Sequence, residues 1–412
     1  MIHYLPLVTI SISMQLQHKN GSNFHLTYCS NIHAGESLRE VLDNIKQHIP
    51  MVRQALKFED KFGLGLRLSA QAAKDLANAE AQQELQQILH DQRCYIFTIN
   101  GFPYGPFHGT RVKEEVYLPD WKDEERLRYT NQLADLFAIF LDNNQIGSIS
   151  TVPGAFKDNV KTEQDRRTMT RLFVSHCAHL ARLEQHTGKC INLALEPEPC
   201  CFLETVEESV DFFSDYLYSD LAVQQLRQEL DVGESEAQTL LRRHLTLCLD
   251  LCHAAVEFER ADQCISALRE ADITIGKLQI SAGLRLQDVN TDRAESLRPF
   301  IDEVYLHQVV ENHNGTINRY SDLPLAFERL VDDDLPREWR VHFHVPIFLD
   351  NLGEFSSTRF FISEALKLHA QDPLSAHLEV ETYTWDVLPD AYKTQSLDDA
   401  IARELDWVRN EL

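Results

Sequence analysis

Three short apolar segments of this sequence end in side chains that could bind a metal ion or move a proton. The side chains are Glu196 after residues 191–195, Asp250 and His253 after residues 245–249, and Glu381 after residues 377–380. Carboxylates and an imidazole together supply the hard oxygen and borderline nitrogen ligands that divalent metal ions bind. Two carboxylates beside such an ion can also act as acid and base on a substrate. The residue types therefore predict metal-assisted proton transfer.

Asp250 and His253 are spaced so that a carboxylate at a strand end and an imidazole on the following turn can face one point. Alone, this spacing is weak evidence, because aspartates often cap helices and histidines are often held by ordinary hydrogen bonds. It predicts a metal site because Glu196 and Glu381 end two other segments of the same kind. A purely structural polar cluster is the alternative interpretation.

Two choices of residue arise around these positions. Glu198 could replace Glu196, but Pro197 interrupts the strand between them, so Glu196 is predicted to be the better placed carboxylate. His342 and His344 share one face of a later segment. They could be metal ligands, substrate contacts or packed core histidines, and the sequence leaves these alternatives open.

A closed parallel barrel is the fold that would bring these segment ends together. In each segment, a period of two places leucines on one face and small or polar side chains on the other. In a barrel the leucines meet the surrounding helices, and the other face lines the interior. The strand ends then converge at one mouth, where barrel enzymes keep their active sites. On the inner face, Glu379 is expected to support Glu381 or to pair with a buried base such as Lys277.

Strands alternate with helices from about residue 24 to the end of the chain. Strands are predicted at residues 24–33, 62–69, 94–100, 148–154, 191–196, 245–250, 273–281 and 376–382, and helices at residues 38–48, 70–90, 126–141, 164–186 and from 397. We therefore predict an α/β protein with one (β/α)8 barrel over residues 24–412 and an extension over residues 1–23. Met14 could be the true start, or residues 1–13 could be an ordinary extra β-segment; no signal peptide is predicted there.

Two further segments exceed the eight strands that such a barrel needs. Residues 303–310 and 339–345 both have strand patterns, and at least one is predicted to belong to an insertion over the mouth. The sequence does not say which. Residues 101–109 are too rich in glycine and proline for regular structure, and residues 110–120 form a long insertion at the same face. Beside them, Tyr104, His108 and Trp121 are candidates for a lid.

The composition excludes several classes of protein. Subtracting 64 acidic from 39 basic residues gives a formal charge of −25, which disfavours binding to nucleic-acid phosphates. The sequence contains nine cysteines and no C-x-x-C pair, which indicates reduced thiols in the cytoplasm. No run of about 18 apolar residues exists, so direct membrane insertion is not expected. Gly63-Leu-Gly65 lacks the third glycine of a dinucleotide loop, and neither a phosphate-binding G-x-x-x-x-G-K-[ST] motif nor a G-x-S-x-G elbow is present.

The order of these motifs resembles that of the xylose-isomerase-like TIM barrels, which include sugar epimerases and the endonuclease IV group. Four segments resemble the EboE family of metabolite traffic proteins more closely still. They are Leu-Glu-Pro-Glu-Pro at residues 195–199, Cys-Leu-Asp-Leu-Cys-His-Ala-Ala at 248–255, Val-His-Phe-His-Val-Pro at 341–346 and Leu-Glu-Val-Glu-Thr-Tyr-Thr-Trp at 378–385. The resemblance covers residues 24–412.

The resemblance implies a site and a role. By similarity to the epimerases, a divalent metal (Mn²⁺, Mg²⁺ or Zn²⁺) would be held by a set drawn from Glu196, Asp250, Gln279, His344 and Glu381. Glu196 and Glu381 would also be the catalytic acid and base. Gln279 stands where those enzymes have a histidine ligand, which weakens the expected metal affinity. Substrate contacts are expected from Asn100, His108, His253, Lys277 and His342.

Similarity to EboE implies the handling of a small secondary-metabolite precursor, with other proteins of the same gene cluster as partners. A sugar isomerase or epimerase is the expected activity, and a metabolite-binding protein without catalysis is the alternative. Compared with endonuclease IV, residues Asn100, Val152 and Gln279 stand where histidines are expected. A three-zinc centre and DNA cleavage by a phosphodiesterase are therefore not favoured.

Overall fold

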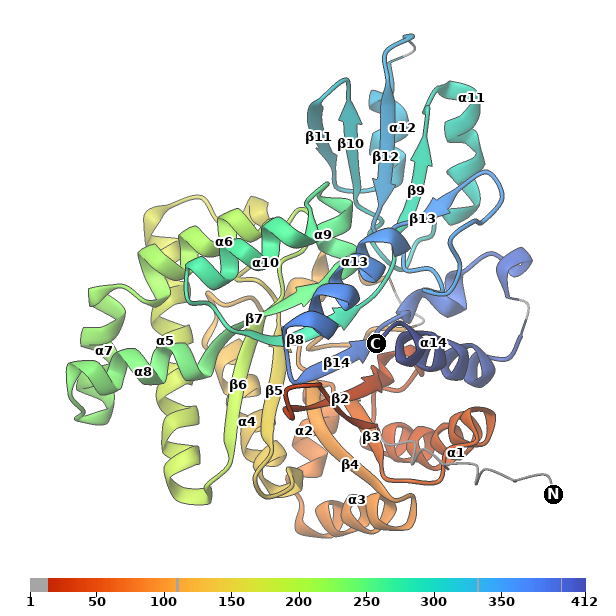
Figure 1. Cartoon of the computed structure of the whole chain (residues 1–412). Coiled ribbons are helices and arrows are strands. Elements are labelled where there is room, and N and C mark those ends of the chain that lie inside the picture. Colours follow the sequence, from red (N-terminus) through yellow and green to blue (C-terminus); the bar gives the residue numbers. More distant parts are fainter. Residues whose placement is uncertain (1–13, 109–110, 332, 394) are drawn as a thin grey trace, which may run out of the picture.

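The computed structural model describes residues 14–108, 111–331, 333–393 and 395–412 of the chain. It is an α/β protein in which a nine-stranded, mostly parallel sheet curls into a nearly closed barrel, surrounded by helices (Figure 1). The strands follow one another round the barrel in the order β1-β2-β14-β8-β7-β6-β5-β4-β3. The predicted α/β class and barrel are confirmed.

The parallel strands of the barrel overlap the predicted ones, although their ends differ by up to five residues. They are β2 (Asn23–Tyr28), β3 (Phe62–Arg67), β4 (Cys94–Asn100), β5 (Ile146–Thr151), β6 (Cys190–Leu195), β7 (Leu245–Asp250), β8 (Ile275–Ile280) and β14 (His377–Val380), and the pairings among these strands are parallel. The ninth strand is β1 (Gln15–Gln17), which pairs antiparallel with β2. It lies within the predicted extension, whose residues 1–13 are outside the described part of the chain.

The barrel closes between β2 and β3 through very few contacts. A single bridge joins Cys29 to Gly65, and the Thr27 hydroxyl donates to the Gly63 carbonyl at 2.7 Å. A Cβ on Gly65 would lie 2.7 Å from the Tyr28 carbonyl oxygen, so only glycine permits this approach. The Gly63-Leu-Gly65 sequence therefore serves the packing of the barrel.

The polar strand faces point into the barrel, as predicted. Lys277 on β8 donates to the Ser150 hydroxyl on β5 at 3.3 Å, although β7 and β6 separate these strands in the sheet. Such a contact has to cross the interior. Lys277 and Glu379 form a fully buried ion pair there, which confirms the predicted pairing.

Helices surround the barrel. They are α1 (Leu38–Leu56), α2 (Ala70–Leu76), α3 (Ala79–Asp91), α4 (Glu124–Phe140), α5 (Glu163–Thr187), α6 (Val206–Phe212), α7 (Asp220–Leu230), α8 (Glu234–His244), α9 (Leu251–Val256), α10 (Ala261–Glu270), α13 (Arg359–Gln371) and α14 (Leu397–Glu411). The start of α1 follows from a capping box between Ser37 and Glu40. Helix α1 continues through Pro50 beyond the predicted end, and the predicted helix at residues 70–90 is two helices.

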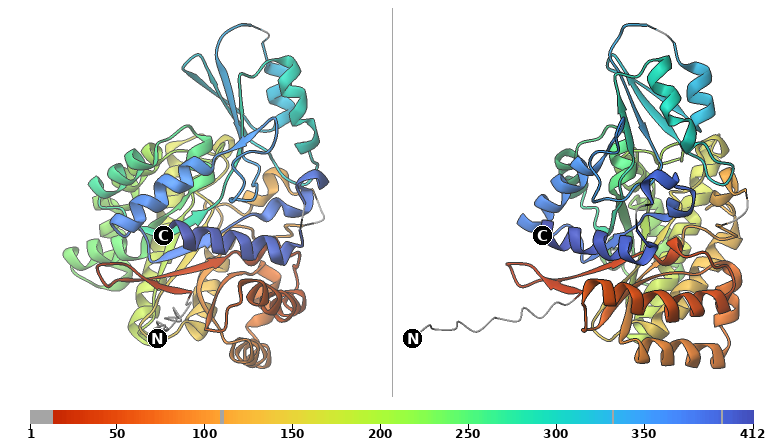
Figure 2. Two further views of the ribbon diagram at one scale, coloured as in Figure 1. Left: turned by 45° about the vertical axis from the view of Figure 1, so that its right-hand side comes forward. Right: turned by 90° about the vertical axis from the view of Figure 1, so that its right-hand side faces the viewer.

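A second sheet stands at one end of the barrel (Figures 1 and 2). Its order is β11 (Thr316–Tyr320), β10 (Val309–His313), β12 (Arg337–Val341), β9 (Leu284–Gln287) and β13 (Ser356–Ser357), with α11 (Thr291–Ala294) and α12 (Leu323–Arg329) in its connections. The predicted strands at residues 303–310 and 339–345 overlap β10 and β12, so neither joins the barrel. None of the helices in the described ranges is long and apolar enough to cross a membrane.

Candidate functional site

Four polar side chains meet where neighbouring barrel strands end. Glu196 directly follows β6, Asp250 ends β7, Gln279 lies near the end of β8, and Glu381 directly follows β14. These strands are consecutive in the sheet, so their parallel alignment brings the side chains together. Each residue is at most 5% exposed. The structure thus places the predicted residues at one mouth of the barrel.

The amide nitrogen of Gln279 sits among the three carboxylates. It donates to Glu196 Oε1 at 2.8 Å, to Asp250 Oδ2 at 3.0 Å, and to Glu381 Oε2. An amide carries two hydrogens, so it cannot serve three acceptors fully. One oxygen of each carboxylate lies within 4.8 Å of the others, and Glu196 Oε2 is buried without a hydrogen-bond partner. Such a cluster needs protons or a cation to balance its charge.

The environment separates the acidities of these groups. Burial, together with the neighbouring carboxylates, raises the pKa of Glu196 well above its ordinary value. Burial, and then Asp250, raises the pKa of Glu381 to about 8. Burial alone would also raise the pKa of Asp250, but His253 and His344 outweigh it and lower that pKa. The surroundings therefore favour the ionised form of Asp250 and the protonated forms of the two glutamates.

Three histidines stand beside the carboxylates with the same orientation. The Nδ1 atoms of His253, His342 and His344 lie 2.8 Å from the Pro197 carbonyl, the Gln308 side-chain oxygen and the Glu381 carbonyl, respectively. The Gln308 amide orientation is fixed, because its nitrogen donates to the Pro199 carbonyl at 3.2 Å. These oxygens only accept, so each Nδ1 carries the hydrogen.

His342 and His344 are neutral, so with Nδ1 donating each presents a lone pair at Nε2. Burial lowers the pKa of His342 well below its ordinary value and that of His344 to about 4, which keeps both rings neutral. The Nε2 atoms of His253 and His342 face each other at 3.1 Å, and His344 Nε2 is buried without a hydrogen-bond partner. Asp250, His253 and His344 also bring ligand atoms within 4.8 Å of one another. Backbone or amide acceptors that fix Nδ1–H and leave Nε2 free are typical of metal-binding histidines.

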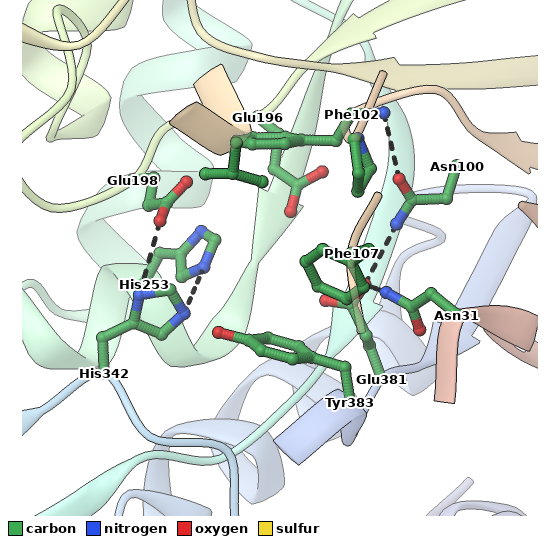
Figure 3. A pocket seen from close by; sticks show the side chains of 12 residues that line it. Asn31, Asn100, Phe102, Phe107, Glu196, Glu198, His253, His342, Glu381 and Tyr383 are labelled. Atoms are coloured by element: carbon green, nitrogen blue, oxygen red, sulfur yellow. Dashed lines mark hydrogen bonds and ion pairs between the residues drawn. The ribbon is translucent and has the colours of Figure 1, made fainter. Parts of the chain in front are cut away.

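A cavity of about 60 Å³ opens above these groups. It is lined by Asn31, Asn100, Phe102, Pro103, Phe107, Val116, Glu196, Glu198, His253, His342, Glu381 and Tyr383. Figure 3 shows the aromatic rings of Phe102, Phe107 and Tyr383 around the carboxylates and imidazoles. Among the lining residues there is no lysine or arginine. The cavity therefore combines apolar ring faces with carboxylate, amide and imidazole groups.

Two loops cover this cavity and contact each other, and together they form its roof. One follows β4 and carries Phe107 and Lys113, and the other precedes β10 and carries Tyr305. Phe107 lies against Tyr305 and Tyr383, with ring centroids 5.2 and 5.3 Å away. Lys113 reaches from the loop after β4 to the Tyr305 carbonyl at 2.7 Å and to Asp322 at 2.8 Å. Of the insertion predicted at residues 110–120, Val116 lines the cavity, and Phe107 reaches it from the glycine- and proline-rich loop before that insertion.

The structure separates the predicted substrate contacts into two groups. Asn100, His253 and His342 line the cavity, and Asn100 donates to Glu381 at 3.0 Å. Lys277 lies deeper, in its ion pair with Glu379, and His108 lies beside Glu36 with Nδ1 3.9 Å from its carboxylate. Neither is among the residues that line the cavity.

The lid predicted from Tyr104 and Trp121 is not what the structure shows. Trp121 is fully buried and donates to the Thr151 hydroxyl at 3.0 Å, because the chain turns into the core before α4. Tyr104 bonds to Glu125 at the start of α4. The roof instead uses Phe102 and Phe107 from the same glycine- and proline-rich loop.

Several site residues were missed by sequence reasoning. Glu198 lines the cavity after all and accepts the Tyr117 hydroxyl at 2.7 Å and the Gln308 amide at 3.1 Å. Asn31 donates to Glu381 at 2.7 Å. Asn31 follows the first barrel strand, as Glu196 follows the fifth, and that shared position is the signal that could have found it.

Comparison with known proteins identifies no family. No protein-family model matches the sequence, and no curated protein matches it. Among solved structures, the probable 3-DHS dehydratase AsbF of Bacillus anthracis is similar, with a TM-score of 0.43 and 12% identity over 93% of this chain and 98% of that one. A magnesium-bound xylose isomerase-like TIM barrel protein from Mycobacterium smegmatis has a TM-score of 0.46 and 13% identity, over 96% of this chain and 93% of that one. A zinc-bound IOLI protein has a TM-score of 0.46 and 10% identity, over 93% of this chain and 96% of that one. None of these values assigns an activity to this chain.

Proposed function

We propose that this protein is a metal-dependent isomerase or epimerase acting on a small polyhydroxylated metabolite. The grouping of the Glu196, Asp250 and Glu381 carboxylates, with the His253 and His344 rings beside Asp250, carries the proposal. Three carboxylates at such distances repel unless protons or a cation lie between them, and a divalent cation would satisfy all three. The sequence resemblance to sugar epimerases supports the same reading.

The residues at the mouth fit such an ion. Asp250 belongs to both clusters of potential ligand atoms, with Glu196 and Glu381 on one side and His344 on the other. Gln279 would join through its carbonyl oxygen if its amide turned over, an orientation that the heavy atoms alone do not fix. Mostly oxygen ligands with one or two imidazoles suit Mn²⁺, Mg²⁺ or Zn²⁺. When bound, the ion would polarise a carbonyl or hydroxyl of the substrate.

The protein's own residues would move the proton. Glu381 is held by the Asn31 and Asn100 amides at 2.7 and 3.0 Å, which fix its orientation, and its pKa of about 8 lies close to neutral pH. Glu196, across the cluster, would act as the second acid or base. The carboxylates of the cavity wall would accept hydrogen bonds from substrate hydroxyls, and the roof would exclude water.

Hydrogen exchange with solvent tests the catalytic reading. Candidate sugars and other polyhydroxylated ketones, incubated in deuterated water with protein and Mn²⁺, should gain deuterium next to the carbonyl. Glu381→Gln should reduce this exchange by at least about 100-fold while binding is largely kept, because the amide preserves shape and loses basicity. Chelated wild-type protein serves as the control. Equal exchange by Glu381→Gln and wild type would contradict the assignment.

A metabolite-binding protein without catalysis is the second candidate. It is favoured by Gln279, whose amide nitrogen already stands among the carboxylates and replaces the histidine ligand expected from the epimerase resemblance. In that case no substrate exchanges hydrogen, a metabolite still binds, and Glu381→Gln weakens its binding. The EboE resemblance would then imply metabolite traffic in the cytoplasm, with partner proteins of the same gene cluster and residues 24–412 as one domain. DNA cleavage is disfavoured by the charge of −25 and by the cavity lining without lysine or arginine.

A further inference from the structure

A second group of mixed ligand atoms lies at the opposite end of the barrel. Glu184 is in the last turn of α5, Cys190 is the first residue of β6, and His244 ends α8 directly before β7. Because β6 and β7 are parallel, their first residues lie at the end of the barrel away from Glu196 and Asp250. One oxygen, the sulfur and one ring nitrogen of these residues lie within 4.8 Å of one another.

The orientation of His244 leaves a lone pair aimed at this group. The side chain is fully buried, and Nδ1 lies 2.7 Å from the Ile191 carbonyl oxygen, which only accepts, so Nδ1 carries the hydrogen. His244 Nε2 is buried without a hydrogen-bond donor, and it faces Glu184 Oε2 at 3.2 Å. Two acceptors at that distance repel unless a proton or a metal ion lies between them.

We propose that Glu184, Cys190 and His244 form a zinc-binding site that is separate from the mouth of the barrel. A thiolate, an imidazole and a carboxylate form a ligand set that suits Zn²⁺, and three protein ligands leave one tetrahedral position for water. The site is reachable from solvent, because the Glu184 side chain is 25% exposed.

The local charges balance around such an ion. The Cys190 thiolate and the Glu184 carboxylate would neutralise Zn²⁺, and Arg243 holds the other Glu184 oxygen at 3.0 Å, which orients Oε2 towards the site. Burial raises the pKa of the free Cys190 thiol to about 11, so zinc binding at neutral pH would release its proton.

The position of the site suggests its effect. An ion there would join the end of α5, the start of β6 and the turn from α8 into β7. The far ends of these two strands carry Glu196 and Asp250. Zinc would therefore stabilise the folded chain and fix two of the strands that present the carboxylates at the mouth.

Cadmium titration of the whole protein tests the proposal, because Cd²⁺ bound to a thiolate gives an ultraviolet charge-transfer band. Wild type should show this band, and Cys190→Ser should lose it. His244→Asn keeps a donor for the Ile191 carbonyl but removes Nε2, so its Cd²⁺ affinity should fall at least about 100-fold. Cys94→Ser is the matched control, since Cys94 is also the first residue of a barrel strand, and it should behave as wild type.

The outcomes separate the alternatives. A band that persists in Cys190→Ser would overturn the proposal and point to Cys252, which lies beside His342 and His344 at the mouth. Absence of any band in folded wild-type protein would also overturn it, and would leave His244 simply paired with Glu184. Circular dichroism confirms that each variant is folded. None of these results depends on whether the mouth is catalytic.

Discussion

Similar carboxyl groups at the mouth are given different acidities by their immediate neighbours. Asp250 accepts the His253 backbone N–H at 2.9 Å and the Ser281 hydroxyl at 2.7 Å, and imidazoles lie beside it. Glu381 has two amide donors but is buried next to Asp250, so its protonated form is favoured. Splitting the acidities of adjacent carboxylates in this way is how a site obtains an anion and a proton carrier at one pH.

This arrangement predicts a pH dependence of stability for the metal-free protein. The pKa of Glu381 rises from 4.5 to about 8 on folding, so the folded state binds more protons between these values. The stabilisation from its protonated form is complete below about pH 4.5 and is lost as the pH rises through about 8. The free energy of unfolding, measured in urea with a chelator present, should therefore fall across this range, and Glu381→Gln should make the fall shallower.

The control for this measurement is Glu36→Gln. Burial alone would raise the pKa of Glu36, but His108, Arg67 and the Phe107 N–H outweigh it and lower that pKa. The slope between about pH 6 and 8 should then stay as in wild type, since Glu36 is ionised in both states there. An identical slope for Glu381→Gln and wild type would show that Glu381 titrates normally.

At the scale of elements, the sequence predicted those strands and helices whose formation depends on the periodicity of a single segment. The barrel strands and the helices α4, α5 and α14 follow from alternation, caps and helical period within single segments. The second sheet could not be assigned, because β9, β10 and β12 pair over long sequence separations that no local pattern encodes. The roof was missed for a similar reason, since it exists only where two remote loops meet.

The contact between those loops gives a testable prediction. The Lys113 ammonium donates to the carbonyls of Asp302 and Tyr305 and to the Asp322 carboxylate. Lys113→Met should cost about 1–3 kcal/mol of stability and loosen the roof, because three acceptors lose a charged donor. Limited proteolysis should cut residues 111–120 faster, and ligand affinity should fall while metal affinity is kept. Arg111→Met removes an exposed cation nearby and should change neither the rate of proteolysis nor the ligand affinity. Equal proteolysis of the two variants would argue against a role of Lys113 in holding the two loops together.

At the scale of the whole molecule, the barrel interior is held by charge as well as by packing. Lys277 and Glu379 come from neighbouring strands, are fully buried, and lie beneath the carboxylates of the mouth. Glu379 attracts the Lys277 ammonium strongly enough to raise its pKa, although burial acts in the opposite direction. The sequence could predict this pair, because both side chains belong to the polar, inward face of their strands. It could not predict how far the pair lies from the cavity, because the depth of a side chain in a barrel depends on how the strands are staggered.

Breaking this pair on one side should be far more damaging than removing both charges. Lys277→Met leaves an uncompensated carboxylate in the interior and should cost about 3–5 kcal/mol in urea unfolding. Adding Glu379→Met should restore most of that loss, because two apolar chains of similar length can fill the same space. The exposed pair of Lys61 and Asp142, 69% and 48% accessible, offers a comparison, and Lys61→Met should cost no more than about 1 kcal/mol. If the double variant is as unstable as Lys277→Met alone, the cost arises from lost packing rather than from an unpaired charge, and the barrel interior depends on the shape of Lys277.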